Sequence, residues 1–364
     1  MENHEYYLWG AGIYGARIID YMKNDLAFKA VIDNDPKKQG SVFHGMPVVS
    51  YEAARDNLPN AKIIIALNVP TEIRELLLAD GFVERKEFFT VHDFIPWFYW
   101  ANKNSIVVKS IDVAATTKCN MKCDGCQTFM PFAVNSKHIS AESILNDVEL
   151  LFTHADAIMN LNFCTGESLL NKDLPEICYQ IYKKYTGRYG WLLVQTNGTI
   201  IPDDAVLRRV SKSKALFGIS NYPENKKTTE KLVAKLSEFN IKWYFNRAGG
   251  KREIWYDWGD PRVVKENNME NLRKLYARCW KPGMALVDGW LYICAAQAWS
   301  HLIVNAGTLE PGDAFDLRQL KNDETRNNLY KIISRQPPKK GYISHCTRCN
   351  SVMTPFIKEP GAFD

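Results

Sequence analysis

The residues of this chain best suited to chemistry are its nine cysteines, and they are clustered rather than evenly spread. Cys119, Cys123 and Cys126 lie close together, Cys346 and Cys349 form a second close pair, and no cysteine precedes Cys119. The first residues, MENHEYYLWG, are acidic where a signal peptide would be basic, so we expect a cytoplasmic protein without an export signal. In that setting clustered cysteines favour metal or redox chemistry over disulfide bonds.

The first cysteine set has the spacing Cys119-x3-Cys123-x2-Cys126 and directly follows an expected strand. One loop can therefore wrap three thiolates around one metal centre. Structural zinc is one interpretation, but zinc prefers four closed ligands, and this loop has no histidine at zinc-finger spacing. Three thiolates on a four-iron cluster instead leave one iron open, as a cluster requires if it is to bind and reduce a substrate.

A second set consists of Cys279, Cys294, Cys346 and Cys349. Residues 284–294, MALVDGWLYIC, predict a β-hairpin that turns at Asp288-Gly289. Four thiolates from a hairpin and a Cys-x-x-Cys loop form a closed set, for which zinc and an iron–sulfur cluster are both candidates.

Two cysteines lie outside these sets. Cys164 and Cys178 are expected to be small buried residues. Cys164 is also a candidate hydrogen-atom donor, because it ends a strand that points toward the site.

The elements that must position these residues follow an alternating pattern. We expect strands over residues 106–114, 157–163, 191–196, 215–220 and 241–246, and helices over 140–152, 174–185, 203–210 and 228–239. This alternation predicts an α/β fold with a parallel sheet and helical crossovers, either open or closed into a barrel. Polar motifs follow the strands: Thr165-Gly166-Glu167, Thr196-Asn197-Gly198 and Ser220.

The cysteine triad and these strand-end motifs together resemble the radical S-adenosylmethionine (SAM) enzymes, over roughly residues 106–247. Thr165-Gly166-Glu167 is similar to the family's Gly-Gly-Glu motif, with Thr165 in place of the first glycine. Gly125 stands where the family often has an aromatic residue that stacks on adenine, and Phe129 or Met130 are candidates to replace it.

The resemblance implies a partial (β/α) TIM-type barrel and two cofactors, a [4Fe–4S] cluster and SAM. Cys119, Cys123 and Cys126 would hold the cluster, whose open iron would bind SAM. Gly166 and Glu167 would orient the SAM amino group, and Thr196, Asn197 and Ser220 would make further SAM contacts. Reductive cleavage would give methionine and a 5′-deoxyadenosyl radical that abstracts a hydrogen atom from substrate.

Behind such a core, the second cysteine set resembles the C-terminal extensions called SPASM and twitch. No cysteine follows Cys349, so the shorter twitch type, with one auxiliary [4Fe–4S] cluster, fits better. Such a cluster could accept an electron and so allow net oxidation of the substrate. An epimerisation would not need this electron acceptor.

The N-terminal segment carries a different signal. Gly10-x-Gly12-x-x-Gly15 follows a strand and opens a helix, and Asp33 ends the next strand. This context is that of a Rossmann-type fingerprint. In such a fingerprint the glycines allow a phosphate to approach the backbone closely, and the acidic side chain accepts a hydrogen bond from a ribose hydroxyl. The segment resembles short Rossmann-like domains of bacterial surface-polysaccharide and nucleotide-sugar enzymes. A docking module without a ligand is the alternative.

We therefore expect three domains: a Rossmann-like unit (1–100), a radical SAM core (101–250) and a small C-terminal auxiliary-cluster extension (251–364). The predicted substrate is a small molecule, a sugar or nucleotide-linked sugar that is oxidised or epimerised, with flavodoxin or ferredoxin as reductant. Modification of a peptide side chain is the rival within the enzyme class, and a nucleotide-binding, zinc-stabilised interaction protein is the rival outside it. The net charge of +5 without a basic patch argues against nucleic acid, and no apolar run is long enough to span a membrane.

Overall fold

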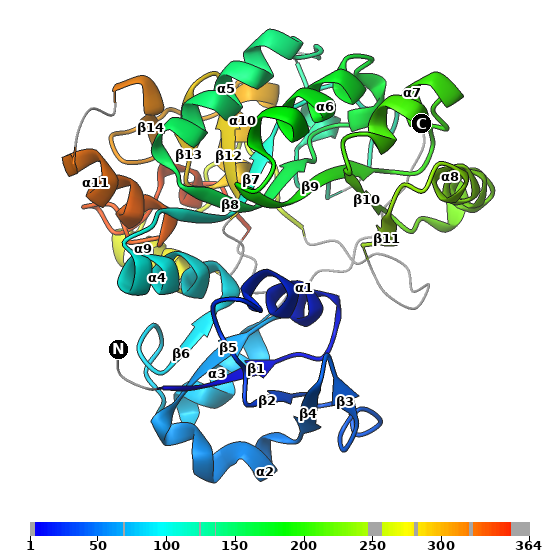
Figure 1. The fold of residues 1–364 in the computed structure, drawn as a ribbon. Helices are drawn as coiled ribbons and strands as arrows, with labels where there is room; N and C mark the ends of the chain where they lie inside the picture. Colours follow the sequence, from blue (N-terminus) through cyan, green and yellow to red (C-terminus); the bar gives the residue numbers. More distant parts are fainter. Residues whose placement is uncertain are drawn as a thin grey trace. The chain divides into compact units, whose positions relative to one another are not determined.

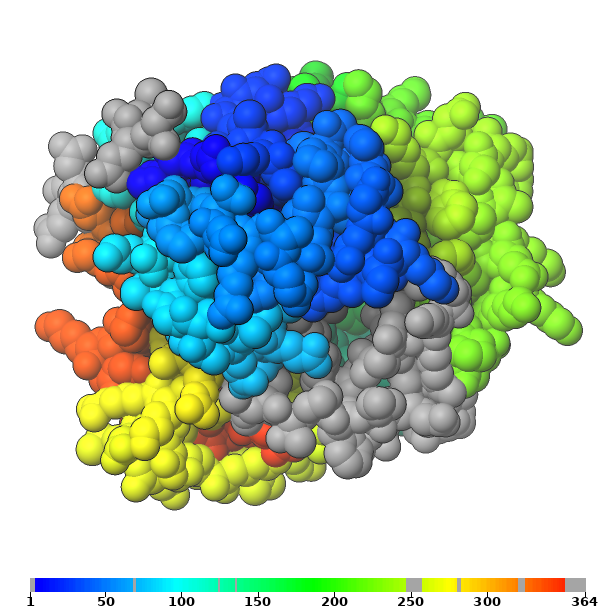
Figure 2. All heavy atoms as spheres, turned by 90° about the horizontal axis from the view of Figure 1, so that it is seen from below, coloured from blue at the N-terminus to red at the C-terminus, as the bar shows by residue number. Residues whose placement is uncertain are grey.

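The computed structural model describes residues 4–67, 70–123, 125–134, 136–246, 257–279, 283–319 and 323–350. The chain divides into two compact units, Met1–Lys109 and Ser110–Asp364. In the space-filling view the blue to cyan atoms of the first unit form one continuous body (Figure 2). The further division of the second unit near residue 250 stays a prediction.

The first unit is a mainly parallel sheet with the strand order β3-β4-β2-β1-β5-β6. Its strands are β1 (Glu5–Trp9), β2 (Ala30–Ile32), β3 (Val42–Phe43), β4 (Met46–Val49), β5 (Ala61–Ile65) and β6 (Phe88–Thr90). Its helices are α1 (Ile13–Met22), α2 (Tyr51–Ala54), α3 (Thr71–Ala79) and α4 (Val91–Lys103). From β1 the chain adds β2 and β4 on one side and β5 and β6 on the other. This doubly wound order places a topological switch point between β1 and β5.

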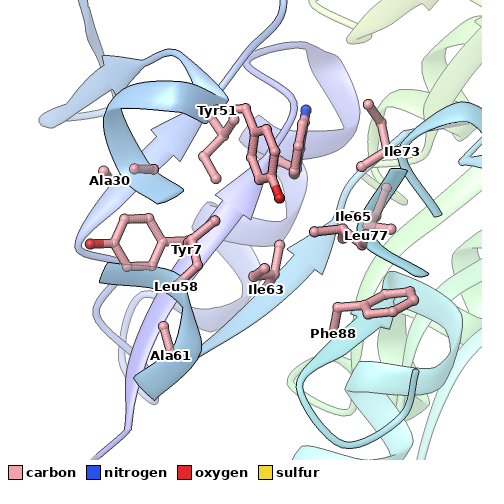
Figure 3. Close-up of a cluster of buried hydrophobic side chains, with 13 residues drawn as sticks. Tyr7, Ala30, Tyr51, Leu58, Ala61, Ile63, Ile65, Ile73, Leu77 and Phe88 are labelled. Atoms are coloured by element: carbon pink, nitrogen blue, oxygen red, sulfur yellow. The ribbon is translucent and has the colours of Figure 1, made fainter. Parts of the chain in front are cut away.

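Apolar strands explain why this sheet is buried on both faces. One face packs a cluster that includes Tyr7, Ile63 and Phe88, and Figure 3 shows these side chains gathered with those of α2 and α3. The other face buries Leu8 and Ile64 completely. Near-continuous apolar runs are typical of parallel strands covered by helices on both sides.

The second unit holds a sheet with the order β11-β10-β9-β8-β7-β12-β13-β14. Its strands are β7 (Val107–Val113), β8 (Ala157–Phe163), β9 (Tyr189–Thr196), β10 (Leu216–Ile219), β11 (Trp243–Phe245), β12 (Met284–Val287), β13 (Trp290–Tyr292) and β14 (Ala314–Asp316). The pairs β8–β9, β9–β10, β10–β11 and β7–β12 are parallel. Across the described residues β11 and β14 are the two ends of the sheet, which is therefore open rather than a closed barrel.

Helices connect the parallel strands as the alternating pattern predicts. They are α5 (Ala141–His154), α6 (Leu174–Tyr185), α7 (Asp204–Ser211) and α8 (Lys226–Glu238), and α5, α6 and α7 lie along one face of the sheet (Figure 1). The predicted α/β class, with five strands and four crossover helices in this segment, is confirmed.

The C-terminal segment extends the same sheet. The predicted hairpin is formed by β12 and β13, and Asp288 and Gly289 turn with φ values of 49° and 74°. Two positive φ values in succession are those of a type I′ turn, which matches the twist of the strands. The remaining helices are α9 (Met269–Arg278), α10 (Ala295–Val304) and α11 (Asp323–Ile333). Among the described helices, none is both long and apolar enough to cross a membrane.

Candidate metal and cofactor site

The first cysteine set lies in the loop that follows β7. Cys123 is buried and packs with Met121 and Tyr222, and Cys119 and Cys126 border the same cluster. The loop is held by tight turns, since the Cys126 N–H donates to the Cys123 carbonyl at 3.2 Å. Gly125 has a φ of 69°, a left-handed conformation that a bulky side chain disfavours. This turn explains why glycine occupies the position before the third cysteine.

The loop is joined to the carboxyl end of β8 by close backbone packing. The Glu167 N–H donates to the Lys118 carbonyl, one residue before Cys119, at 2.9 Å. Gly166 has a φ of 61°, and a Cβ there would lie 2.2 Å from that same carbonyl oxygen. Glycine is therefore required at this position both by the backbone conformation and by the approach of the cysteine loop.

Glu167 ties two strand ends together. Its side chain is completely buried; Oε1 accepts from Thr196 Oγ1 at 2.9 Å and from the Leu169 N–H at 3.1 Å, and Oε2 accepts from the Asn197 N–H at 2.7 Å. Burial raises the pKa of Glu167 to about 7. The carboxylate thus aligns the ends of β8 and β9, and its direct contact with a SAM amino group stays a prediction.

Asn197 connects the end of β9 to the cysteine loop. Its Nδ2 lies 3.9 Å from Cys119 Sγ and donates to Asn120 Oδ1 at 3.0 Å. Asn225, which follows β10, donates to the Asn197 carbonyl at 3.0 Å and contacts Met121 Sδ at 3.5 Å. Asn225 was not among the residues expected from the sequence, because an asparagine beyond a proline predicts only a turn.

Ser220 lies at the same edge. Its N–H donates to the Thr196 carbonyl at 2.9 Å, and its Oγ accepts from Asn246 Nδ2 at 3.4 Å. The structure therefore brings the cysteine loop together with Gly166, Thr196, Asn197 and Ser220 at the carboxyl ends of parallel strands, where such folds build their active sites.

The second cysteine set is gathered by three elements. Cys279 ends α9, Cys294 precedes α10, and Cys346 lies in the short 3₁₀ helix Ser344–Thr347, which packs against α9. Burial, together with the neighbouring Cys279 and Cys349, raises the pKa of Cys294 to about 12. Burial also raises the pKa of Cys346, and the other three cysteines of the set add to that rise. The four thiols therefore lie in one region.

Tyr276 is a residue of this region that the sequence did not single out. It is 8% exposed, and its hydroxyl has no hydrogen-bond partner among the described residues. Burial raises its pKa to about 12, with Cys346, Cys279 and Cys294 as neighbours. Its position one helical turn before Cys279 is the signal that could have identified it.

Both sets fit a metal that binds sulfur, although neither has ligand geometry as it stands. None of the nine cysteines, all of which the structure describes, forms a disulfide bond. Burial raises the pKa of Cys119 to about 11, so its thiol is protonated until a metal displaces the proton. Over the described ranges, no three cysteine, histidine or acidic side chains converge on a single point. Sets of three or four cysteine thiolates are the ligands that typically bind iron–sulfur clusters and zinc.

One apolar cluster borders both sets. It includes Phe129, Met130 and Trp299 and touches Cys119, Cys126 and Cys294. Phe129 also contacts the ring of His345, with 5.9 Å between centroids. Apolar side chains therefore lie against cysteines of both sets.

The two remaining cysteines have different surroundings. Cys178 is completely buried in α6. Cys164 follows β8 and hydrogen-bonds the Asp112 carboxylate; burial, then Asp112, raises its pKa well above the ordinary value. The Cys164 thiol therefore keeps its hydrogen.

The glycine loop of the first unit lies between β1 and α1, next to the switch point. A Cβ on Gly15 would lie 2.0 Å from the Gly10 carbonyl oxygen, whereas a Cβ on Gly12 would have no neighbour within 4 Å. Asp33 Oδ2 accepts from the Ala11 N–H at 2.7 Å and from Lys38 Nζ at 3.0 Å. Asp33 thus supports the loop, and its contact with a ribose stays a prediction.

Comparison with known proteins gives partial likenesses only. No family model matches the chain, and no curated protein matches it. Among solved structures, anSMEcpe with bound AdoMet and the Cp18Cys peptide is 20% identical, with a TM-score of 0.32 over 38% of this chain and 42% of that chain. BtrN in complex with AdoMet and 2-DOIA is 12% identical, with a TM-score of 0.41 over 69% of this chain and 96% of that chain. HydG, a maturase of the [FeFe]-hydrogenase, is 14% identical, with a TM-score of 0.31 over 42% of this chain and 38% of that chain. This chain thus spans less than half of anSMEcpe and HydG, and at these TM-scores the likenesses do not decide function.

Proposed function

We propose that this protein is a radical SAM enzyme, which abstracts a hydrogen atom from a small-molecule substrate. The observation that carries the proposal is the junction of the cysteine triad with the strand ends. The Lys118 carbonyl accepts a hydrogen bond from the Glu167 N–H, and Asn197 Nδ2 lies 3.9 Å from Cys119 Sγ. Three thiols and the Gly166 backbone therefore share one edge of a parallel sheet.

The residues of this edge would hold the cluster and SAM or align the strands that carry them. Cys119, Cys123 and Cys126 would hold a [4Fe–4S] cluster, and Gly166, Thr196, Asn197 and Ser220 would hold SAM. When bound, these groups supply a 5′-deoxyadenosyl radical. Glu167 fixes the relative position of β8 and β9 through its hydrogen bonds with Thr196 and Asn197. Phe129, which is 1% exposed, helps to exclude water.

The second cysteine set would hold an auxiliary [4Fe–4S] cluster of the twitch type. Support comes from the gathering of Cys279, Cys294, Cys346 and Cys349, and a closed zinc site uses the same four donors. Metal analysis and visible absorption of anaerobically purified protein separate the two. A colourless protein that holds only zinc would favour the nucleotide-binding interaction protein.

The proposed substrate is a sugar or nucleotide-linked sugar, oxidised or epimerised in the cytoplasm with electrons from flavodoxin or ferredoxin. An auxiliary cluster would favour oxidation, because it can accept an electron from a substrate radical. Cys164 would favour epimerisation, because its protonated thiol carries a transferable hydrogen.

The test is formation of 5′-deoxyadenosine from SAM by anaerobic, iron-reconstituted protein with a strong reductant. Cys123→Ala should abolish the product while the second cluster stays bound, because Cys123 belongs only to the first set. Cys178→Ala, a matched change of a buried cysteine in α6, should retain it. Equal product from Cys123→Ala and wild type would refute the proposal, and loss of all iron in Cys123→Ala would contradict two separate cluster sites.

A further inference from the structure

A line of polar side chains crosses the sheet of the second unit just before its strands end. We call it the polar row; its members are Ser110, Asp112, Asn160, Asn162, Cys164, Gln195 and Tyr244. Successive strand residues point to opposite faces, and the register pairs Asn160 with Trp191, and Gly218 with both Gln195 and Tyr244. The alternate residues of β8 and β9 are apolar and completely or almost completely buried: Met159, Leu161, Phe163, Leu192 and Val194. One face of the sheet is therefore apolar, and the other carries the polar row.

Two of the three amides of the polar row use their N–H groups within the protein. Asn162 Nδ2 donates to Ser110 Oγ and to Asp112 Oδ1, each at 2.9 Å. Gln195 Nε2 donates to the Tyr244 hydroxyl at 3.0 Å. A flipped Asn162 amide would set its oxygen against the Asp112 carboxylate, so its orientation is fixed.

The amide oxygens of the same row are unsatisfied hydrogen-bond acceptors. Asn160 Oδ1, Asn162 Oδ1 and Gln195 Oε1 are buried and have no hydrogen-bond partner within the described structure. Asn160 is 6% and Asn162 is 9% exposed, so neither side chain escapes to solvent. Unpaired buried acceptors are costly, and native proteins retain them where something else satisfies them.

Gly218 makes room for the third of these oxygens. A Cβ on Gly218 would lie 2.3 Å from Gln195 Oε1, so the glycine lets the Gln195 amide lie across β10 and reach β11. Ser110, Asp112 and Gln195 are half-buried, so part of the polar row reaches solvent.

We propose that the polar row binds the hydroxyl groups of an uncharged, sugar-like part of the substrate. Three acceptors in need of donors match a ligand with several hydroxyls. The row contains no lysine or arginine, so a phosphate or carboxylate would find no cation there. Its last members, Cys164 and Gln195, directly precede Thr165 and Thr196, which places a bound sugar beside the edge that carries the cysteine loop. The inference rests on the proposed function and deepens it.

The experiment measures binding by saturation-transfer NMR, independently of turnover. The probes are the methyl glycosides of glucose, galactose, mannose and N-acetylglucosamine, each beside its per-O-methylated counterpart, which keeps the ring but has lost its hydroxyl donors. We expect at least one free-hydroxyl glycoside to bind the cluster-loaded protein and its methylated counterpart not to bind. Binding of none of the glycosides, which would leave only water on the polar row, overturns the inference.

Variants locate the bound probe. Asn160→Leu and Gln195→Leu should each weaken binding about fivefold, the usual effect of one hydrogen bond. Gln195→Glu keeps the acceptor and should bind better than Gln195→Leu. Gly218→Ala should resemble Gln195→Leu, because the new methyl group displaces the Gln195 amide. Gln180→Leu, on the exposed face of α6, is the matched control and should bind as wild type. Equal binding by all variants would place the sugar elsewhere.

Formation of 5′-deoxyadenosine separates failure of this inference from failure of the proposed function. SAM cleavage without substrate should be the same in Gln180→Leu and wild type, because Gln180 of α6 belongs neither to the cysteine edge nor to the polar row. If wild type cleaves SAM and no glycoside binds, the polar row is not a sugar site. If wild type does not cleave SAM but the glycosides bind as expected, the proposed function fails and the sugar site remains.

Discussion

At the scale of single residues, Gly166 shows how closely the site depends on backbone geometry. Its φ is 61°, and a Cβ on this residue would lie 2.2 Å from the Lys118 carbonyl oxygen, so two separate requirements select glycine. Gly187 has only the first of these, since its φ is 90° but a Cβ there would have no neighbour within 4 Å. Substitutions at these two glycines therefore separate the cost of the left-handed backbone from the cost of a steric clash.

Gly187→Ala should cost about 1–2 kcal/mol of unfolding free energy through its left-handed backbone alone. Gly166→Ala should cost clearly more, and it should also lower iron retention at the proposed first cluster, because the new methyl group pushes away the loop segment that leads to Cys119. Chemical denaturation and iron analysis of both variants check this. Equal stability and iron content in the two would contradict the packing role of Gly166.

The residue scale also shows what a sequence can predict of a site. The spacing of Cys119, Cys123 and Cys126 and the position of Thr196, Asn197 and Ser220 after strands were readable, because parallel strands end at one edge. The structure places these residues at that edge. The orientation of Glu167 into the protein, the contact of Asn225 with Met121 and the unpaired oxygens of the polar row were not readable, because each depends on which distant groups the fold brings close.

At the scale of elements, one carboxylate anchors the hairpin to a helix. Asp147 of α5 is 6% exposed and accepts from the backbone N–H of Gly289 at 2.6 Å and of Asp288 at 2.9 Å. Burial raises its pKa from 3.8 to about 6, despite these two donors. The turn that joins β12 to β13 is thus held from a helix far away in the sequence.

Asp147 should make stability depend on pH in a defined direction. Because its pKa is higher in the folded than in the unfolded chain, its contribution is greatest at low pH and is lost as the pH rises from about 4 through 6. The free energy of unfolding should fall by about 3 kcal/mol from this group, about half of it above pH 5.

Asp147→Asn should remove this fall, since the amide does not titrate. Urea denaturation of wild type and variant at several pH values measures the difference. Asp156→Asn, at an ion pair with Arg326 where both side chains are well exposed, should keep the wild-type profile. A wild-type profile in Asp147→Asn would show that another group governs the pH dependence.

The elements themselves were largely predictable. The alternating apolar segments gave the strands and helices of residues 106–247, and Asp288-Gly289 gave the hairpin turn, because both signals are local. The pairing of β12 with β7 was not predictable, since more than 150 residues separate the two strands, and no local pattern encodes such a partner.

At the scale of the whole molecule, the first unit is a small doubly wound sheet with its own buried core. Its glycine loop follows β1, beside the switch point at which such sheets bind ligands. Gly12, which is the N-cap of α1, leaves open space beside the first turn of that helix. These features support the proposal that the first unit binds a nucleotide.

Gly12→Val should weaken binding of UDP-glucose by tenfold or more in calorimetry, because the side chain would occupy the place of the phosphate. The free protein should lose only about 1 kcal/mol of stability, the cost of valine at a helix N-cap, since Gly12 has a φ of −135° and a Cβ there meets no other atom within 4 Å. Unchanged affinity would remove the nucleotide assignment. A wild type that does not bind UDP-glucose would favour the docking module.

The junction of β12 with β7 has a consequence for how this chain can be shortened. A protein that ended near residue 250 would keep the first cysteine set but would uncover the flank of β7, with its row of backbone N–H and C=O groups. Such a flank recruits strands from other molecules, so the truncated protein should aggregate even though its triad is intact. The C-terminal segment should therefore also protect the chain from self-association, by covering this strand edge, a role that does not depend on any metal at the second cysteine set.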